Sequence, residues 1–410
     1  MGCKRPLAAV TGAYALTMPG VCAFVASLAP YGSKLVYRYT DTFSPHNACQ
    51  QRRSAHVMTE MPGGAGRKKV VFLGTPDVAA SSLELLLRAS RQGRGGGFDI
   101  VRAVSNPPAR VGRKKVLKPC PVQTLAESEG VPVMIPSSAK DDGFLVDLEE
   151  LGPDLCITAA YGQFLPQRFL DIPKFGTLNV HPSLLPRYRG ASPVQRCLEA
   201  GEPETGVTVA FTVLKMDAGP IVRQKVRALN GAEKTPDLLR ELFEQGTEEL
   251  IDCLSGVWDG SVVKKPQDDA AAVKAAKLSI DEARCCFETS SATQIHNKVR
   301  AFSGWPGTWA LFCWGNCGDG AEDRKVKLIT TAVGPPPPPD GGTTEGPRDD
   351  RRVILKGDAL ELTCADGSIL RVLELQPLNK NVMGAKAFVN GLRGEEMRWV
   401  EHKPVEAVAA

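Results

Sequence analysis

Short runs of aliphatic and β-branched residues alternate with segments of helical periodicity between residues 69 and 214. The runs expected as strands are residues 69–75, 98–105, 155–161, 176–183 and 206–214. Between the first three of them, residues 76–90 and 121–130 carry apolar side chains at the spacing of an amphipathic helix. Parallel strands need crossover helices on both faces, so this order predicts an α/β fold with a doubly wound, mostly parallel sheet. Function is then expected at the carboxyl ends of the strands.

The first turn of this sheet lacks a dinucleotide-binding motif. Its sequence FLGTPD, residues 72–77, holds one glycine, whereas the phosphate-binding G-x-G-x-x-G pattern needs three. The expected fold is therefore Rossmann-like in its sheet without the nucleotide fingerprint of that fold.

After about residue 265 the sequence changes to short β-rich runs, at residues 325–333, 352–364 and 369–377. Such runs close into a small, OB-like β-barrel. A proline- and glycine-rich insert at 334–351 cannot bury apolar surface, and we expect it to be disordered. The predicted organisation is a catalytic domain at 67–265, a linker at 266–280, a C-terminal barrel domain at 281–402 and a tail at 403–410.

Residues 1–66 differ in composition from the rest of the chain. Asp41 is the only acidic residue between Met1 and Thr59, whereas six lysines and arginines lie in the same stretch. This composition is typical of a disordered organelle-targeting leader. We expect an organelle matrix, the mitochondrion in preference to the plastid stroma. The sequence contains no apolar run of the roughly 18 residues that a membrane span needs, so no membrane association is expected.

A polar pair stands at the end of an otherwise apolar strand, in TLNVHPSLLPRYRGASP, residues 177–193. Side chains alternate along a strand with period two, so Asn179 and His181 are expected on one face. Pro182, Pro186 and Pro193 each fix one backbone angle, which predicts a stiff loop behind the pair.

Asp217 follows the next strand, in KMDAGPI, and can lie beside His181 at the same edge of the sheet. An Asn, a His and an Asp, without a nucleophile or a metal-ligand set, suit transfer of an acyl group to an amine. Asn179 can donate its amide N–H to the oxyanion of a tetrahedral carbon. His181 can donate a second hydrogen bond or move protons, and Asp217 can fix its tautomer and relay the proton that the amine loses.

Several motifs in this order resemble the methionyl-tRNA formyltransferase family. They are FLGTPDVAA, AAYGQFLP, LNVHPSLLPRYRGASPVQ and MDAGPI, followed in the C-terminal part by VRAFSGWPGTW. The resemblance covers about residues 69–400. It implies an enzyme that transfers a formyl group from 10-formyltetrahydrofolate to the amino group of methionine on initiator tRNA. It also implies a barrel domain that binds tRNA. We expect a monomeric protein without a metal.

The family's motifs place particular roles on residues of this chain. The catalytic residues would be Asn179, His181 and Asp217. The folate-binding residues would be Tyr161, Ser183, Leu184, Leu185 and Pro186. The tRNA-binding residues would be Arg110, Arg113, Lys114, Lys115, Arg187 and Arg189, of which the first four lie in a basic loop after the second strand. The family usually carries a PAGRGKK pattern in that loop, where this chain reads ARVGRKK.

Two other interpretations remain open at this point. A phosphoribosylglycinamide formyltransferase would use the same three residues on a small phosphorylated amine, but it leaves residues 266–402 without a role. A nucleic-acid-binding barrel joined to an inactive formyltransferase domain would predict the loss of one of the three residues, and all three are present. The basic loop itself could be a solvated surface, as charge runs usually are.

Overall fold

The computed structural model describes residues 66–112, 115–315, 317, 323–335 and 351–400. Three predicted segments lie wholly or mostly outside the described residues. They are the leader (residues 1–65 of 1–66), the insert (residues 336–350 of 334–351) and the tail (403–410).

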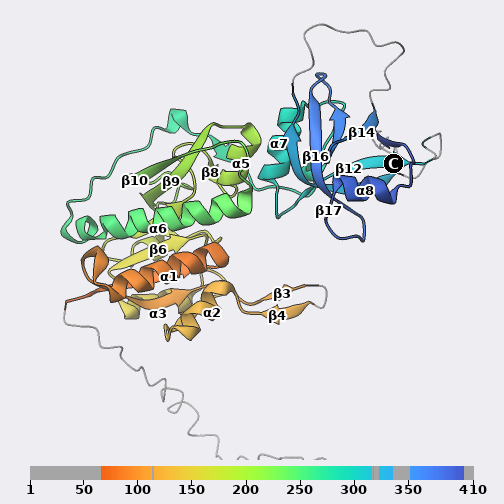
Figure 1. Cartoon of the computed structure of the whole chain (residues 1–410). Coiled ribbons are helices and arrows are strands. Elements are labelled where there is room, and N and C mark those ends of the chain that lie inside the picture. The colour runs from red at the N-terminus through yellow and green to blue at the C-terminus, as the bar shows by residue number, and fades with distance from the viewer. Residues whose placement is uncertain (1–65, 113–114, 316, 318–322, 336–350, 401–410) are drawn as a thin grey trace, which may run out of the picture. The chain divides into compact units, whose positions relative to one another are not determined.

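The N-terminal domain is built on a seven-stranded sheet with helices on both faces (Figure 1). Its elements are β1 (Lys68–Gly74), α1 (Asp77–Arg91), η3 (Arg94–Gly96), β2 (Phe98–Val104), β3 (Ala109–Val111), β4 (Val116–Lys118), α2 (Pro121–Ser128), β5 (Val133–Met134), α3 (Asp142–Leu151), β6 (Leu155–Ala159), α4 (Gln167–Leu170), β7 (Thr177–His181), β8 (Arg189–Gly190), α5 (Pro193–Ala200), β9 (Glu204–Phe211), β10 (Ile221–Ala228) and α6 (Thr235–Asp259).

The strand order of this sheet is β10-β9-β7-β6-β1-β2-β5. The five strands from β7 to β5 pair in parallel. The last two strands are antiparallel, β9 to β7 and β10 to β9. The doubly wound, mostly parallel sheet predicted from the sequence is therefore confirmed.

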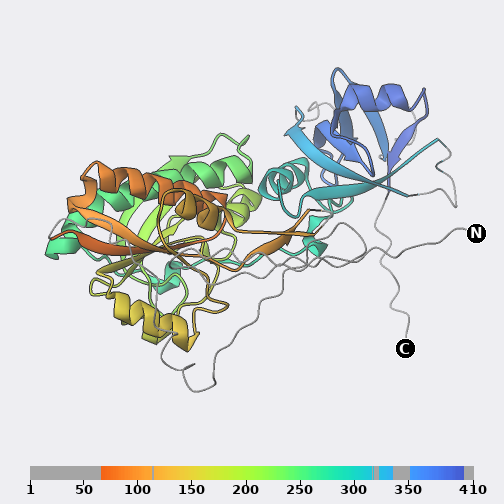
Figure 2. The same cartoon turned by 90° about the horizontal axis from the view of Figure 1, so that it is seen from below.

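The alternation within β1 explains why its sequence is apolar throughout. Val70 and Phe72 pack under α1, α2 and α6, whereas Val71 and Leu73 pack under α3 and α4 on the opposite face. Both faces of the strand are thus buried, as expected for a parallel sheet covered on both sides. Figure 2 shows α1 and α6 on one side of the sheet and α3 on the other.

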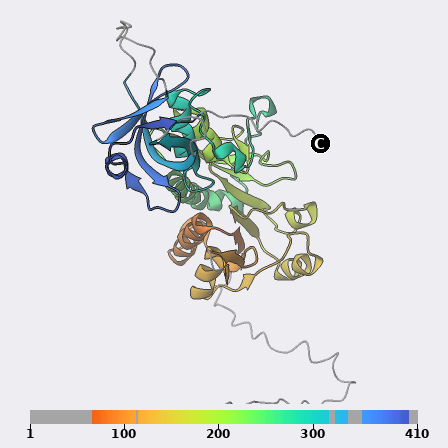
Figure 3. The same ribbon diagram turned by 90° about the vertical axis from the view of Figure 1, so that its right-hand side faces the viewer.

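The C-terminal domain contains a closed barrel among the described residues. Six antiparallel strands follow one another in the order β13-β12-β18-β14-β15-β16, and β16 pairs with β13 to close the ring. The curved strands are seen in Figure 3. The elements are α7 (Ala292–Ala301), β12 (Thr308–Trp314), β13 (Arg324–Val333), β14 (Arg352–Lys356), β15 (Ala359–Thr363), β16 (Ile369–Pro377), β17 (Met383–Gly384), α8 (Ala385–Gly391) and β18 (Met397–Trp399). The predicted small barrel is confirmed.

Helix α7 begins at a capping box, because the Ser291 hydroxyl accepts from the Gln294 amide and the Gln294 side chain accepts from the Ser291 amide. Its far end, at Ala301 and Phe302, packs with apolar side chains of α5 and α6. Within the described residues, no helix has both the length and the apolar character needed to cross a membrane.

Candidate active site

Asn179 lies on β7 directly beside Thr158 of β6, at the carboxyl end of the parallel part of the sheet. The Asn179 Oδ1 atom accepts a hydrogen bond from Thr158 Oγ1 at 2.8 Å. The alternative acceptor for this hydroxyl, the Leu178 carbonyl, lies farther away at 3.3 Å. Because the amide oxygen is occupied in this way, the Asn179 Nδ2 group is the end of the carboxamide that remains to donate to a ligand.

His181 is two residues farther along β7 and is buried, with 5% of its surface exposed. Its Nε2 atom lies 3.0 Å from the backbone carbonyl oxygen of Tyr188. A carbonyl can only accept, so this nitrogen carries the proton and donates it. In the neutral ring, Nδ1 is consequently the basic nitrogen, and it is the nitrogen that faces Asp217.

Asp217 lies beside the histidine as predicted, with 3.8 Å between its Oδ1 atom and His181 Nδ1. This distance is too long for a hydrogen bond. The other carboxylate oxygen, Oδ2, accepts from the backbone N–H of Gly190 at 2.9 Å. The expectation that Asp217 fixes the tautomer of His181 is therefore corrected, since the Tyr188 carbonyl does so. The carboxylate is instead placed to stabilise a proton that arrives on Nδ1.

The backbone of Asp217 has φ at +49°, in the left-handed region. Aspartate is among the few residues other than glycine that adopt this region readily, because its short polar side chain can hydrogen-bond locally. The turn is followed by Gly219, where an added Cβ would lie 1.8 Å from the Phe211 carbonyl oxygen. No other residue than glycine fits there.

The loop after His181 is held from inside by Thr208 of β9, which is opposite His181 in the sheet. Its fully buried hydroxyl donates to the Ser183 carbonyl at 2.6 Å and accepts from the Leu185 amide at 3.1 Å. Gln224 of β10 adds bonds to the Leu185 carbonyl at 2.8 Å and to the same hydroxyl at 3.0 Å. Three strands thus define the course of this loop.

The predicted folate-binding residues differ in what they expose. Ser183 and Leu185 are buried, whereas Leu184 and Pro186 are half-buried. The Ser183 hydroxyl is occupied by the Arg187 carbonyl at 2.8 Å. Tyr161 is also buried, in the apolar cluster under α3, and this burial raises the pKa of its hydroxyl to about 12. In the segment from Ser183 to Pro186, a ligand can therefore contact the side chains of Leu184 and Pro186 and the backbone groups.

The predicted basic loop forms a two-stranded hairpin, in which Arg110 of β3 pairs with Leu117 of β4. The β-branched valines at positions 111 and 116 favour strand over loop. Figure 1 shows the hairpin extending away from the sheet and helices of its domain. Arg110 and Lys115 are exposed, and Arg113 and Lys114 lie outside the described residues.

Arg187 and Arg189, also predicted to contact tRNA, lie in different surroundings. Arg187 is exposed and forms an ion pair with Glu202. Arg189 is buried, and its guanidinium donates to Gln267 at 2.8 and 3.0 Å and to Asp269 at 2.7 Å. Its bonds are made within the chain, so we do not retain Arg189 among the residues proposed for tRNA binding.

Sequence reasoning missed Thr158, the Tyr188 carbonyl and Gln267. Thr158 could have been found, because it is the one hydroxyl in the buried run LCITA of β6. The backbone carbonyl of Tyr188 and the linker residue Gln267 carry no signal of this kind, since their roles follow from the path of the loops.

Replacing Thr158 with valine should lower the turnover number by about five- to tenfold, because the carboxamide of Asn179 loses the bond that orients it. Valine keeps the shape of threonine and changes only this hydroxyl. Steady-state kinetics with saturating substrates measure the effect, and Thr158→Ser, which restores the hydroxyl, should return most of the activity. Unchanged turnover in Thr158→Val would mean that the orientation of Asn179 does not depend on Thr158.

Comparisons with known proteins agree with the two domains. A formyl transferase family model matches residues 68–254, and a model of the formyl transferase C-terminal domain matches residues 277–393. A methionyl-tRNA formyltransferase of Macrococcus caseolyticus is 35% identical over 80% of this chain and 96% of its own length. A methionyl-tRNA formyltransferase of Nitratidesulfovibrio vulgaris is 35% identical over 78% of this chain and 92% of its own length.

Solved structures resemble this chain in fold. An N-formyltransferase from Helicobacter canadensis, in complex with folinic acid and dTDP-3-aminofucose, superposes with a TM-score of 0.52 at 16% identity. The match covers 76% of this chain and 99% of that chain. The sugar 3N-formyl transferase WlaRD, solved with dTDP and 5-N-formyl-THF, gives a TM-score of 0.51 at 16% identity, covering 77% of this chain and 99% of that chain.

Proposed function

The chain belongs to the methionyl-tRNA formyltransferase family, and on this premise we propose how its residues transfer a formyl group to methionyl-tRNA. The enzyme is a folate-dependent one-carbon transferase whose acceptor is the amino group of methionyl-tRNA. We propose 10-formyltetrahydrofolate as the donor. The observation that carries the proposed chemistry is the convergence of Asn179, His181 and Asp217 at one edge of the sheet.

Asn179 stabilises the charge that develops on the formyl oxygen. As the neutral methionyl nitrogen bonds to the formyl carbon, the C=O bond becomes a C–O⁻ single bond, and Nδ2 of Asn179 donates a hydrogen bond to that oxygen. A preorganised donor of this kind contributes roughly 3 to 4 kcal/mol to the stability of the transition state. The Thr158 hydroxyl keeps the carboxamide in the required orientation.

His181 moves the proton. Its Nδ1 lone pair accepts the proton that the attacking amine loses, and Nε2–H stays bonded to the Tyr188 carbonyl. The carboxylate of Asp217 stabilises the imidazolium that results, across the 3.8 Å that separate the two groups. The same proton then passes to the nitrogen that leaves the formyl carbon, so the donor is released as tetrahydrofolate. Each charge is thus met by a group of the protein, and we propose a transfer without a metal.

The donor is proposed to lie along the loop from Ser183 to Pro186. Leu184 and Pro186 offer the apolar surface of that loop, and Ser183 and Leu185 keep its shape through Thr208. Assay of the purified enzyme with 10-formyl- and with 5-formyltetrahydrofolate tests the donor. The proposal expects formyl transfer from the 10-formyl compound, and transfer from the 5-formyl compound alone would refute it.

We propose that the basic residues of the segment 110–115, which are Arg110, Arg113, Lys114 and Lys115, bind phosphates of the tRNA together with Arg187. Lysine and arginine on phosphates release counterions, which gives affinity that falls steeply with salt. Combined replacement of Arg110 and Lys115 by alanine should weaken tRNA binding and reduce the salt slope by about one for each phosphate that the variant no longer binds. Binding titrations at several salt concentrations measure this slope.

Arg91→Ala is a matched control for the hairpin variant, because Arg91 is an exposed arginine of α1 paired with Glu129. It should leave the salt slope unchanged. An unchanged slope in the hairpin variant as well would mean that the hairpin is a solvated surface that does not bind tRNA phosphates.

We propose that the protein works as a monomer in an organelle matrix, the mitochondrion in preference to the plastid. The basic, acid-poor composition of residues 1–66 supports the organelle. N-terminal sequencing of the mature protein from isolated organelles tests the compartment and the cleavage site together. Recovery of the intact N-terminus from the cytosol alone would refute the proposal.

The phosphoribosylglycinamide alternative is not favoured. The curated relatives that match over almost their whole length are methionyl-tRNA formyltransferases, and the C-terminal domain is matched by its own formyl transferase model. Residues beyond 265 therefore have a role that the single-domain alternative leaves unexplained.

A further inference from the structure

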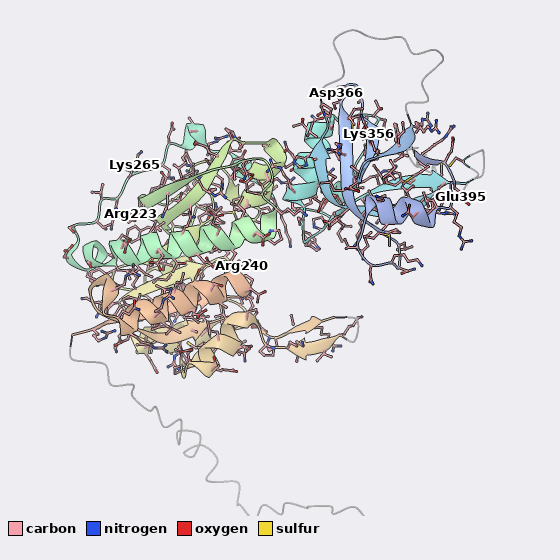
Figure 4. All side chains as sticks on the ribbon, in the orientation of Figure 1. Arg223, Arg240, Lys265, Lys356, Asp366 and Glu395 are labelled. Atoms are coloured by element: carbon pink, nitrogen blue, oxygen red, sulfur yellow. The ribbon has the colours of Figure 1, made fainter. Side chains whose placement is uncertain are left out.

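The segment that leaves the N-terminal domain runs across the loops that carry the candidate active site. We call residues 265–275 the strap. It begins with two backbone bonds between Lys265 and Ile221, at 2.7 and 2.8 Å. It ends in β11 (Lys274–Ala275), which pairs in parallel with β8. Figure 4 labels Lys265 at the start of the strap and Arg223 on the neighbouring β10.

Gln267 of the strap joins two loops through both ends of its carboxamide. Its Nε2 group donates to the carbonyl of Asp217 at 2.9 Å and to the carbonyl of Gly219 at 2.7 Å. Its Oε1 atom accepts from Arg189, from Nε at 3.0 Å and from Nη2 at 2.8 Å. One side chain therefore connects the turn that holds Asp217 to the segment next to Gly190.

These two loops meet a second time, at the carboxylate itself. The Gly190 N–H donates to Asp217 Oδ2, and the strap fixes the position of Gly190 from the other side. A Cβ at Gly190 would lie 2.5 Å from the Ala275 carbonyl oxygen, and its φ of +129° also requires glycine. The strap therefore packs against the backbone group that orients Asp217.

The groups around Gln267 require a side chain that both donates and accepts hydrogen bonds. Arg189 is a buried cation, and buried cations need their donors occupied. The left-handed turn at Asp217 leaves the carbonyls of Asp217 and Gly219 close enough to share one Nε2 group. Only a side chain with an acceptor at one end and a donor at the other satisfies both loops at once.

We propose that Gln267 is a positioning residue for formyl transfer, which clamps the Asp217 turn to the Arg189–Gly190 segment and so sets the carboxylate beside His181. This inference rests on the proposed catalytic function of Asn179, His181 and Asp217. It makes the strap a working part of the active site in addition to a connection between two domains.

Gln267→Glu tests the clamp with little change in shape. The new carboxylate still accepts from Arg189, but it sets a negative oxygen against the two carbonyls that Nε2 served. We expect kcat to fall about tenfold or more while the KM for methionyl-tRNA stays within about twofold. Gln267→Leu, which removes all four bonds without adding a charge, should act in the same direction and keeps the test available if the first variant does not fold. Circular dichroism checks folding of both.

A double-mutant cycle with Asp217→Asn separates positioning from a general structural effect. If Gln267 acts through Asp217, then Gln267→Glu should cost little further kcat once Asp217 is asparagine. A full tenfold loss in that background, or a change in KM alone, would overturn the proposal. Gln92→Glu, the same change at an exposed glutamine just after α1, is the matched control and should leave kcat unchanged.

The wild-type enzyme in the same assays tells the two failures apart. Formylation of methionyl-tRNA by the wild type with no effect of Gln267→Glu would refute the clamp and leave the proposed function standing. Absence of formylation in the wild type would refute the proposed function itself.

Discussion

Replacing Asn179 with alanine is expected to lower the turnover number for formyl transfer by about two to three orders of magnitude. The carboxamide oxygen of Asn179 accepts a hydrogen bond from Thr158. Its Nδ2 group therefore faces the ligand as a donor, and we expect it to donate to the formyl oxygen as that oxygen becomes negative. This bond strengthens as charge develops, and its loss therefore lowers kcat with little change in substrate affinity. Single-turnover kinetics with prebound methionyl-tRNA measure the chemical step.

The control for this variant is Asn390→Ala, an exposed asparagine of α8. It should keep wild-type turnover, and binding titrations should show the same tRNA affinity for the wild type and both variants. Near-normal turnover in Asn179→Ala would remove Asn179 from the chemistry, and a loss of tRNA affinity alone would make it a binding residue.

Replacing His181 with alanine is the second change of large expected effect, again about two to three orders of magnitude in turnover. The ring presents Nδ1 toward Asp217 because Nε2–H is committed to the Tyr188 carbonyl. Without the imidazole, the amine loses its proton acceptor and the leaving nitrogen loses its donor. Both steps then depend on water.

Rapid-quench measurement of formyl-methionyl-tRNA follows this variant, with His402→Ala as the matched histidine control. Because the ring is buried, circular dichroism must show that the His181 variant keeps its fold. Wild-type turnover in the folded His181→Ala protein would contradict the proton-transfer role. The Asn179 and His181 losses should also be far from additive, because the two groups serve one transition state.

The sheet could be predicted because its sequence signal is local. In β1, four consecutive apolar residues are buried on alternating faces, and that requires helices on both sides. The reversal of β9 and β10 could not be predicted, because antiparallel pairing depends on where the chain turns in space. The strand β10 is exposed along most of its length at the edge of the sheet, and its charged sequence gives no apolar run to recognise.

The candidate site likewise has some features that the sequence predicts and others that it does not. Period-two alternation correctly predicts that Asn179 and His181 share a face, and the register with Thr158 and Thr208 places them at one edge. The bond that fixes the histidine tautomer comes from a backbone carbonyl, which any residue at position 188 would offer. The Gln267 clamp depends on a linker that returns to the site after 50 residues, from Asp217 to Gln267. Such bonds depend on the path of the chain in space, and no periodic pattern in the sequence indicates them.

The acceptor specificity of the purified enzyme tests the central claim most directly. Incubated with labelled 10-formyltetrahydrofolate and equal concentrations of methionyl-tRNA and glycinamide ribonucleotide, the protein should place the label on the methionyl amine, and Asn179→Ala should abolish most of that labelling. Label on glycinamide ribonucleotide, or equal labelling of methionyl-tRNA by the wild type and by Asn179→Ala, would contradict the account.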